Sequence, residues 1–99
     1  MNIKNNEVYT FKLNSGEEVI AKVLEFTEKQ VKIEEPVSIA PGPQGVGMIP
    51  SLFTVDTKDE IVINTNCIAI YGLTDESIKR KYIEATTGIT VPSKKLVLG

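Results

Sequence analysis

The feature that most constrains the fold is a strand–turn–strand pattern near the start of the chain. In residues 8–13, V-Y-T-F-K-L, apolar side chains alternate with polar ones, so that Tyr9, Phe11 and Leu13 share one side. This is the period of a half-buried β-strand. The N-S-G sequence at 14–16 favours a turn, because Asn and Gly tolerate positive φ. The pattern predicts an antiparallel hairpin.

The second strand of this hairpin carries apolar side chains on both faces. Residues 19–26 place Val19, Ala21 and Val23 on one face, and Ile20, Leu24 and Phe26 on the other. A flat sheet with one buried face does not need this pattern. A strongly bent strand in a small barrel does, because one part of it faces the core while another packs against a neighbouring element. The second strand therefore predicts a bent, barrel-type sheet.

A third strand and a proline-glycine segment follow. Residues 27–30 make a polar turn, and residues 31–33 begin a strand that completes an antiparallel meander. Pro36 cannot donate a ladder hydrogen bond, so it marks a bulge or an edge, beyond which the strand can resume. Residues 41–47, P-G-P-Q-G-V-G, are expected to form a loop. This segment lacks the glycine and lysine spacing of a phosphate-binding loop.

The remaining β-segments are short. An apolar stretch at 48–55 precedes a charged turn at 57–60 and a short strand at 61–63. A tight turn at 64–66 leads to a last strand at 68–73. These segments end the β part of the chain, which we take as residues 1–73.

The hydrophobic period changes at residue 75, so that 74–99 form a separate helical part. Asp75 and Glu76 suit a helix N-terminus, Gly88 is a fitting stop, and an apolar face combines Ile78, Tyr82 and Ala85. The pattern predicts one amphipathic helix of about three turns. The tail from residue 90 either frays or adds to a sheet edge.

Composition limits the function classes. The chain of 99 residues supports one core, and it contains no histidine, the most common general base and metal ligand. We therefore expect no enzyme activity, no metal site and no cofactor. The formal net charge of −2 argues against unspecific coating of DNA. Cys67 lies in an apolar run and is expected to be a buried small hydrophobe.

The chain carries no pattern that predicts membrane insertion or export. No apolar run approaches the roughly 20 residues that span a bilayer. Residues 1–15 lack the apolar core of a signal sequence. We expect a cytoplasmic protein without a membrane partner.

Two segments resemble the first motif of Sm-like proteins. Residues 13–23, L-N-S-G-E-E-V-I-A-K-V, resemble its L-x-x-G-x-x-V-x-G-x-L core, with Ala21 where the family usually has glycine. Residues 26–33, F-T-E-K-Q-V-K-I, resemble F-D-x-x-x-N-L-x-L, although they are one residue shorter. Thr27 and Gln30 therefore stand in the Asp and Asn positions.

The resemblance extends to the second Sm motif. Residues 63–70, I-N-T-N-C-I-A-I, resemble its I-R-G-x-x-I pattern, with Asn64 and Thr65 in the Arg-Gly places. The segments 13–23, 41–47 and 81–89 together are similar to small proteins of marine cyanophages that have an Sm-like fold. This similarity implies a phage protein that acts in the cytoplasm of an infected host cell.

The resemblance implies a fold, an assembly and a binding site. The fold is mainly β, a five-stranded, strongly bent antiparallel open barrel with a C-terminal α-helix. Subunits pair edge to edge into a homo-oligomeric ring, which binds single-stranded RNA, or single-stranded DNA, through two loops. We add an aromatic residue near the end of the last strand, where its ring can reach a surface. The candidate nucleic-acid-binding residues are Thr27, Lys29, Gln30, Asn64, Thr65, Asn66 and Tyr71.

Several alternatives remain open. Asn64 has no guanidinium group, so a second hypothesis is an oligomeric scaffold or regulatory module that contacts only protein. Tyr9 and Phe11 are either stacking platforms or core residues, and alternation in a strand favours the core. Residues 79–81, K-R-K, either follow a nucleic-acid backbone or form a solvated helix face, which we favour.

Overall fold

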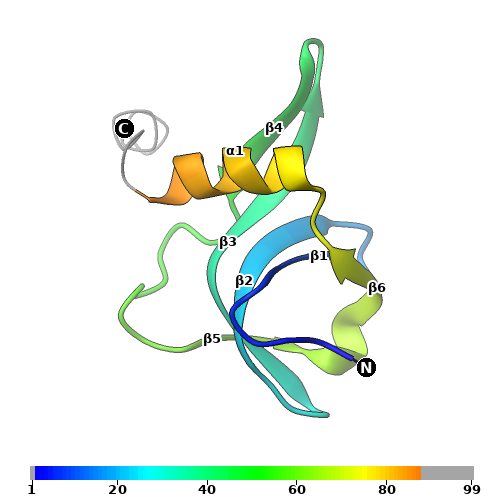
Figure 1. Cartoon of the computed structure of the whole chain (residues 1–99), viewed down its shortest axis with the longest axis vertical. Coiled ribbons are helices and arrows are strands. Elements are labelled where there is room, and N and C mark those ends of the chain that lie inside the picture. The colour runs from blue at the N-terminus through cyan, green and yellow to red at the C-terminus, as the bar shows by residue number, and fades with distance from the viewer. Residues whose placement is uncertain (1, 88–99) are drawn as a thin grey trace.

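A computed structural model describes residues 2–87, which form one antiparallel β-sheet and one α-helix (Figure 1). The six strands are β1 (Val8–Leu13), β2 (Glu18–Phe26), β3 (Gln30–Gly42), β4 (Gly45–Pro50), β5 (Ile61–Asn64) and β6 (Ile68–Leu73). A short 3-10 helix, η1 (Thr65–Cys67), connects β5 to β6, and α1 (Glu76–Thr86) follows β6. The predicted mainly β fold with a C-terminal helix is confirmed.

The long strand β3 organises the sheet. One of its edges pairs with β2, while the other pairs with β5 at residues 30–33 and then with β4 at residues 37–42. β1 joins the far edge of β2, and β6 joins β1. The change of partner falls at Glu35, which has a positive φ of 52°, and Pro36. The register between β2 and β3 shifts at the same place. Of the two alternatives predicted at Pro36, a bulge or an edge, the structure shows the bulge, and the strand resumes beyond it.

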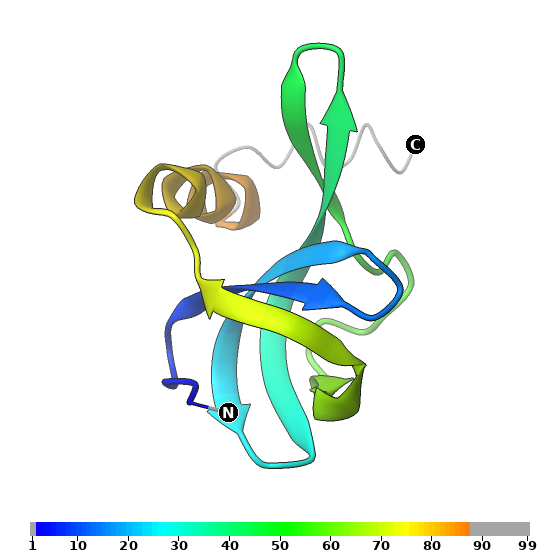
Figure 2. The ribbon, with the colours of Figure 1, turned by 90° about the vertical axis from the view of Figure 1, so that its right-hand side faces the viewer.

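The loop predicted at residues 41–47 is wrong, because this segment is a β-hairpin. β3 and β4 stay paired as far as Gly42 and Gly45, and only Pro43 and Gln44 lie between the strands. Backbone pairing needs no side chain, and Gly45 adopts a φ of 115° that closes the turn. We call residues 39–48 the hairpin arm, which stands out from the sheet (Figure 2). The arm supplies the strand that brings the sheet to six instead of the expected five.

The prediction that β2 buries side chains on both faces is confirmed, but the place predicted for Phe26 is wrong: it packs with the cluster of Ala21 and Val23, because the register of β2 shifts between Val23 and Glu25. On one face Ala21 and Val23 pack with Tyr9, Phe11, Val31 and Ile33 in the main core cluster. On the other face Ile20 packs with Val8, Val37 and Tyr82 beneath α1 (Figure 1). The burial of Tyr9 and Phe11 confirms that these two aromatic residues belong to the core.

The helix begins where the sequence indicates. The carboxylate of Asp75 caps it by accepting from the backbone N–H groups of Ser77 at 3.1 Å and Ile78 at 3.3 Å. The helix ends at Thr86. The stop predicted at Gly88 and the tail from residue 90 lie outside the described residues.

Two predictions around residue 67 are wrong. Residues 65–67 form η1 instead of a simple tight turn at 64–66, and Cys67 is exposed instead of buried. The reason is the position of β6 in the sheet. Among the strands of residues 2–87 its one partner is β1, and Ile70 and Leu73 keep 66% and 62% of their surfaces exposed. An apolar run on a strand paired along one side does not have to be buried.

Candidate nucleic-acid interface

Two turns that are far apart in sequence meet at one end of the sheet. The first, residues 27–30, connects β2 to β3, and the second, residues 64–67, includes η1. Gln30 and Asn64 are paired across β3 and β5. The backbone N–H of Thr65 donates to the carbonyl of Lys29 at 3.0 Å. Six of the seven candidate residues therefore lie on two joined turns, which we call the paired turns.

The hydroxyl groups of the two threonines hold these turns in shape. The Oγ1 atom of Thr27 donates to the carbonyl of Gln30 at 3.1 Å and accepts from its N–H at 3.2 Å. The Oγ1 atom of Thr65 donates to the carbonyl of Glu28 at 2.6 Å. A hydroxyl has only one proton to donate, so each donates within the protein. Thr27 and Thr65 are positioning residues in this arrangement.

The side chains at the surface of the paired turns include three amides, one ammonium group and the carboxylate of Glu28. Lys29, Gln30, Asn64 and Asn66 are all exposed. Amide groups both donate and accept hydrogen bonds, so they match the edges of nucleic-acid bases, and Lys29 can meet a phosphate. The carboxylate of Glu28 in the same turn opposes that charge. Asn66 is fixed through its backbone carbonyl, which accepts from the side-chain amide of Asn14 at 2.8 Å.

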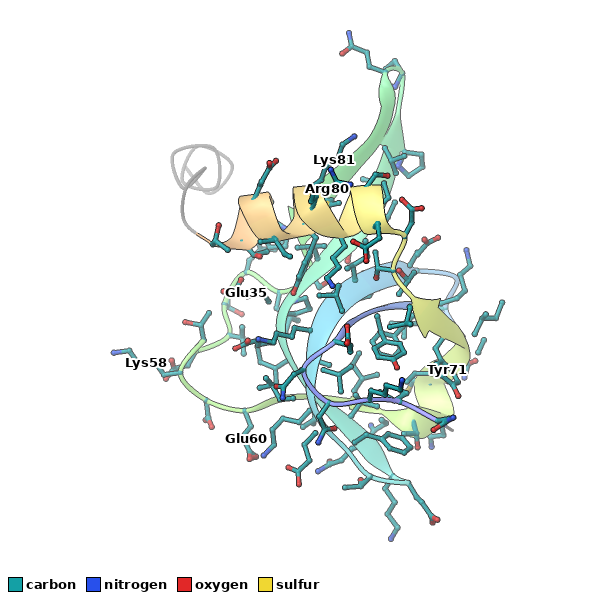
Figure 3. All side chains as sticks on the ribbon, viewed as in Figure 1. Glu35, Lys58, Glu60, Tyr71, Arg80 and Lys81 are labelled. Atoms are coloured by element: carbon teal, nitrogen blue, oxygen red, sulfur yellow. The ribbon has the colours of Figure 1, made fainter. Side chains whose placement is uncertain are left out.

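Tyr71 makes its contacts in another part of the molecule. Its hydroxyl accepts from the backbone N–H of Asn2 at 2.8 Å, and its ring centroid lies 6.4 Å from that of Tyr9. The side chain is half-buried and packs against the main core cluster. In Figure 3 it projects from β6, on the opposite side of the view from Glu60. The structure therefore provides no link between Tyr71 and the paired turns.

The cations of the molecule are spread over several elements. On β3, Lys32 forms ion pairs with Glu60 at 2.8 Å and Glu25 at 3.2 Å, and hydrogen bonds with these carboxylates raise the pKa of Lys32. Arg80 and Lys81 are exposed on α1, away from the paired turns (Figure 3). No second cluster of cations therefore adds to the charge of Lys29 within residues 27–30 and 64–67.

Sequence reasoning missed a groove and an exposed apolar pattern. The segment 51–60, which connects β4 to β5, borders a groove of about 560 Å³ against β2 and β3. Its signal in the sequence was the apolar stretch at 48–55, which was not assigned to a strand or a site. Val62 on β5 and Ile70 on β6 are also exposed, although both lie in strands.

Two comparisons with known proteins give no relative on which to base a function. No family model matches the chain, and no curated protein matches it. Among residues 2–87 there is no group of three His, Cys, Asp or Glu side chains that could hold a metal ion. In the same part of the chain no helix is both long and apolar enough to cross a membrane. The functional argument therefore depends on the geometry of the paired turns.

Proposed function

We propose that this chain is an Sm-like protein that assembles into a ring, binds single-stranded RNA or DNA through the paired turns, and takes part in nucleic-acid processing. The observation that carries the proposal is the hydrogen bond from Thr65 N–H to the carbonyl of Lys29, which joins two turns 36 positions apart in the sequence. The same two segments are those whose sequences resemble the loops with which Sm-like rings bind RNA. This bond brings the polar side chains of the two turns to the same end of the sheet.

The order of the strands supports an Sm-like barrel. In this proposal β1, β2, β3, β5 and β6 are the five barrel strands, and β4 is an addition that belongs to the hairpin arm. The first motif then corresponds to β1 through the start of β3, and the second to β5, η1 and β6. The bulge at Glu35 and Pro36 supplies the bend that β3 needs to serve both the barrel and the arm.

Ring assembly is supported by the free strand edges. β5 pairs only with β3, and β6 only with β1, so within residues 2–87 each strand has an edge without a strand partner. Pairing of β5 in one subunit with β6 in the next would satisfy both edges in a closed cycle. Val62, Ile70 and Leu73 expose apolar surface on these strands, and such a contact would cover it.

A protein scaffold or regulatory module without nucleic-acid binding is the second candidate. It is supported by the net charge of −2 and by Asn64, which has neither the charge nor the stacking plane of arginine. This candidate forms the same ring as the nucleic-acid-binding candidate, but its paired turns contact protein instead of nucleic acid. In either form we propose a cytoplasmic protein, in an infected host cell if the resemblance to cyanophage proteins reflects its origin.

Fluorescence anisotropy separates the two candidates. U-rich and A-rich oligonucleotides are titrated at two salt concentrations with the unchanged protein, Lys29→Ala, Asn64→Ala and the control Lys58→Ala. We expect Lys29→Ala to weaken binding and to reduce the salt slope by about 1, and Asn64→Ala to weaken binding without changing the slope. Lys58 lies on the segment 51–60, so its replacement should have no effect (Figure 3). No binding at low salt would leave the scaffold candidate.

Light scattering coupled to size-exclusion chromatography tests the ring. We expect Ile70→Lys, on β6, to break the assembly, because it places a charge in the proposed contact. Val46→Lys, on the hairpin arm, is the matched control and should leave the ring intact, since Val46 is equally exposed but lies on β4, outside the proposed contact between β5 and β6. A monomer at micromolar concentration for the unchanged protein would count against the assembly.

A further inference from the structure

A groove lies where β3 changes its partner from β5 to β4. Its walls come from β2, from β3 and from the segment 51–60, and its volume is about 560 Å³. The segment 51–60 has to lead from β4 to β5, which both pair with the same edge of β3. It does so as an open loop, and the hollow lies between this loop and the strands. The volume is in the range of known binding sites, about 300–1,000 Å³.

The loop side of the groove is apolar. Leu52, Phe53 and Val55 line it and are all exposed, with 56% of the surface of Phe53 open to solvent. Connecting segments normally carry polar side chains, since water surrounds them. A group of large exposed apolar side chains bordered by polar residues is typical of an interaction surface.

The border of the groove is acidic. It holds four carboxylates and two ammonium groups, from Glu34, Glu35, Asp59, Glu60, Lys32 and Lys58. The formal balance is −2. Lys32 forms ion pairs with Glu25 and Glu60, and Glu34 forms one with Lys22, so these pairs engage carboxylates of the border as well as its ammonium groups. The groove therefore favours a ligand that combines apolar side chains with positive charge.

A segment that follows α1 in the sequence has this chemistry. Residues 94–98, K-K-L-V-L, place two lysines directly before three apolar residues, and residues 88–99 contain no Asp or Glu. The last turn of α1 leads towards the groove. Ala85 and Thr86 line a small hollow beside the groove. Glu35, Pro36 and Pro50 line both this hollow and the groove.

We propose that residues 94–98 bind in this groove of the same chain. Leu96 and Leu98 contact the apolar side chains of the segment 51–60, and the two lysines meet the acidic border. The link from residue 88 to residue 93 spans up to about 20 Å when extended. It starts beside a hollow that shares three lining residues with the groove. Attachment to the same chain also gives the segment a high effective concentration. The inference does not depend on nucleic-acid binding by the paired turns.

Paramagnetic relaxation in the full-length protein tests the proposal. Cys67→Ser removes the exposed native thiol, and Gly99→Cys carries a nitroxide label beside the proposed contact. We expect the amide signals of residues 52–60 to be weaker with the nitroxide oxidised than in the same protein after the nitroxide is reduced. The signals of residues 43–46 in the hairpin arm should have the same intensity in both samples. Phe53→Ser should lower the occupancy of the groove about fivefold or more, because it removes an apolar contact. Val46→Ser, which replaces another exposed apolar side chain on the arm, should leave the occupancy unchanged.

Two results would overturn the proposal. One is that residues 52–60 lose no more intensity on oxidation of the label than residues 43–46 do. The other is intensity loss at 52–60 in a mixture of isotope-labelled protein without nitroxide and nitroxide-labelled protein without isotope. That loss would show that the segment binds a second copy. Intensity loss that occurs when the same chain carries both the isotope and the nitroxide, but not in the mixture, would support binding within one chain. The double substitution Lys94→Glu/Lys95→Glu should weaken this loss.

Discussion

The hydroxyl group of Tyr82 is the main polar contact between α1 and the sheet, and its removal is a sensitive test of the structure. Tyr82 is buried, and its Oη atom accepts from the backbone N–H of Lys22 at 3.1 Å. The same hydroxyl lies 2.8 Å from the carbonyl oxygen of Glu35 and 3.1 Å from that of Glu34, either of which it can donate to. These groups belong to β2 and to the bulge of β3.

The substitution Tyr82→Phe keeps the ring and deletes only these hydrogen bonds. It removes one hydrogen-bond partner from a part-buried N–H and from a part-buried carbonyl, which costs about 1–3 kcal/mol. Tyr82→Ala also empties the space of the ring between Ile20 and Val37, so its cost should be larger, about 3–5 kcal/mol. The difference between the two variants separates the hydroxyl from the packing of the ring.

The effect of Tyr82→Phe should depend on pH. Burial raises the pKa of the Tyr82 hydroxyl above its ordinary value of 10. The unfolded chain therefore loses this proton at lower pH than the folded protein does. The stability that the hydroxyl contributes is fully present below pH 10 and is lost as the pH rises through the folded-state pKa. The advantage of the unchanged protein over Tyr82→Phe should be constant near neutral pH and shrink in strong alkali.

Urea unfolding followed by far-UV circular dichroism measures these quantities. We expect Tyr82→Phe to unfold at a lower urea concentration than the unchanged protein. The dependence of the unfolding free energy on urea concentration should be unchanged, because the surface exposed on unfolding is nearly the same. Equal midpoints for the unchanged protein and Tyr82→Phe at neutral pH would refute the hydrogen-bond argument. Equal losses for the Phe and Ala variants would refute the separate role of the ring.

Three further predictions concern turns and caps. Gly45→Ala should destabilise the hairpin arm by about 1–3 kcal/mol, because its φ of 115° strains any side chain, whereas Gly47→Ala should have little effect; amide hydrogen exchange in the arm measures both. Asp75→Ala should reduce helix content in circular dichroism. The hydrogen bond from the Ser77 hydroxyl lowers the pKa of Asp75, so this difference should persist above pH 3.8 and disappear as the pH falls through the folded-state pKa. Thr65→Val removes the hydrogen bond to Glu28 and should cost about 0.5–1.5 kcal/mol, with chemical-shift changes in both paired turns.

Local patterns predicted the elements whose cause is local. The alternation in residues 8–13, the apolar side chains on both faces of β2 and the cap at Asp75 each appear in the structure as expected. The bulge at Pro36 was also predictable, because proline has no N–H to donate. These features depend on side chains that are neighbours in the sequence or lie one strand apart.

The features that were missed depend on which strands become neighbours. Nothing in the P-G-P-Q-G-V-G segment reveals that Gly42 will pair with Gly45, because the stabilising groups are in the backbone. The exposure of Cys67 follows from the position of β6 in the sheet, which no residue count provides. For the site, resemblance brought residues 27–30 and 64–66 together as candidates. Only the structure shows that the hydroxyl groups of Thr27 and Thr65 are used to hold the turns.

The pairing of β1 with β6 has a consequence for folding. β1 and β2 are joined through a short turn, whereas the bond between the hydroxyls of Thr10 and Thr74, 2.9 Å long, connects residues 64 positions apart. Ordering such a long loop is entropically unfavourable until the intervening strands are formed. We therefore expect the meander of β1, β2 and β3 to form first and β6 to dock last. Since α1 follows β6 directly, the contacts of Tyr82 would then be among the last to form, and their loss would accelerate unfolding more than it slows folding.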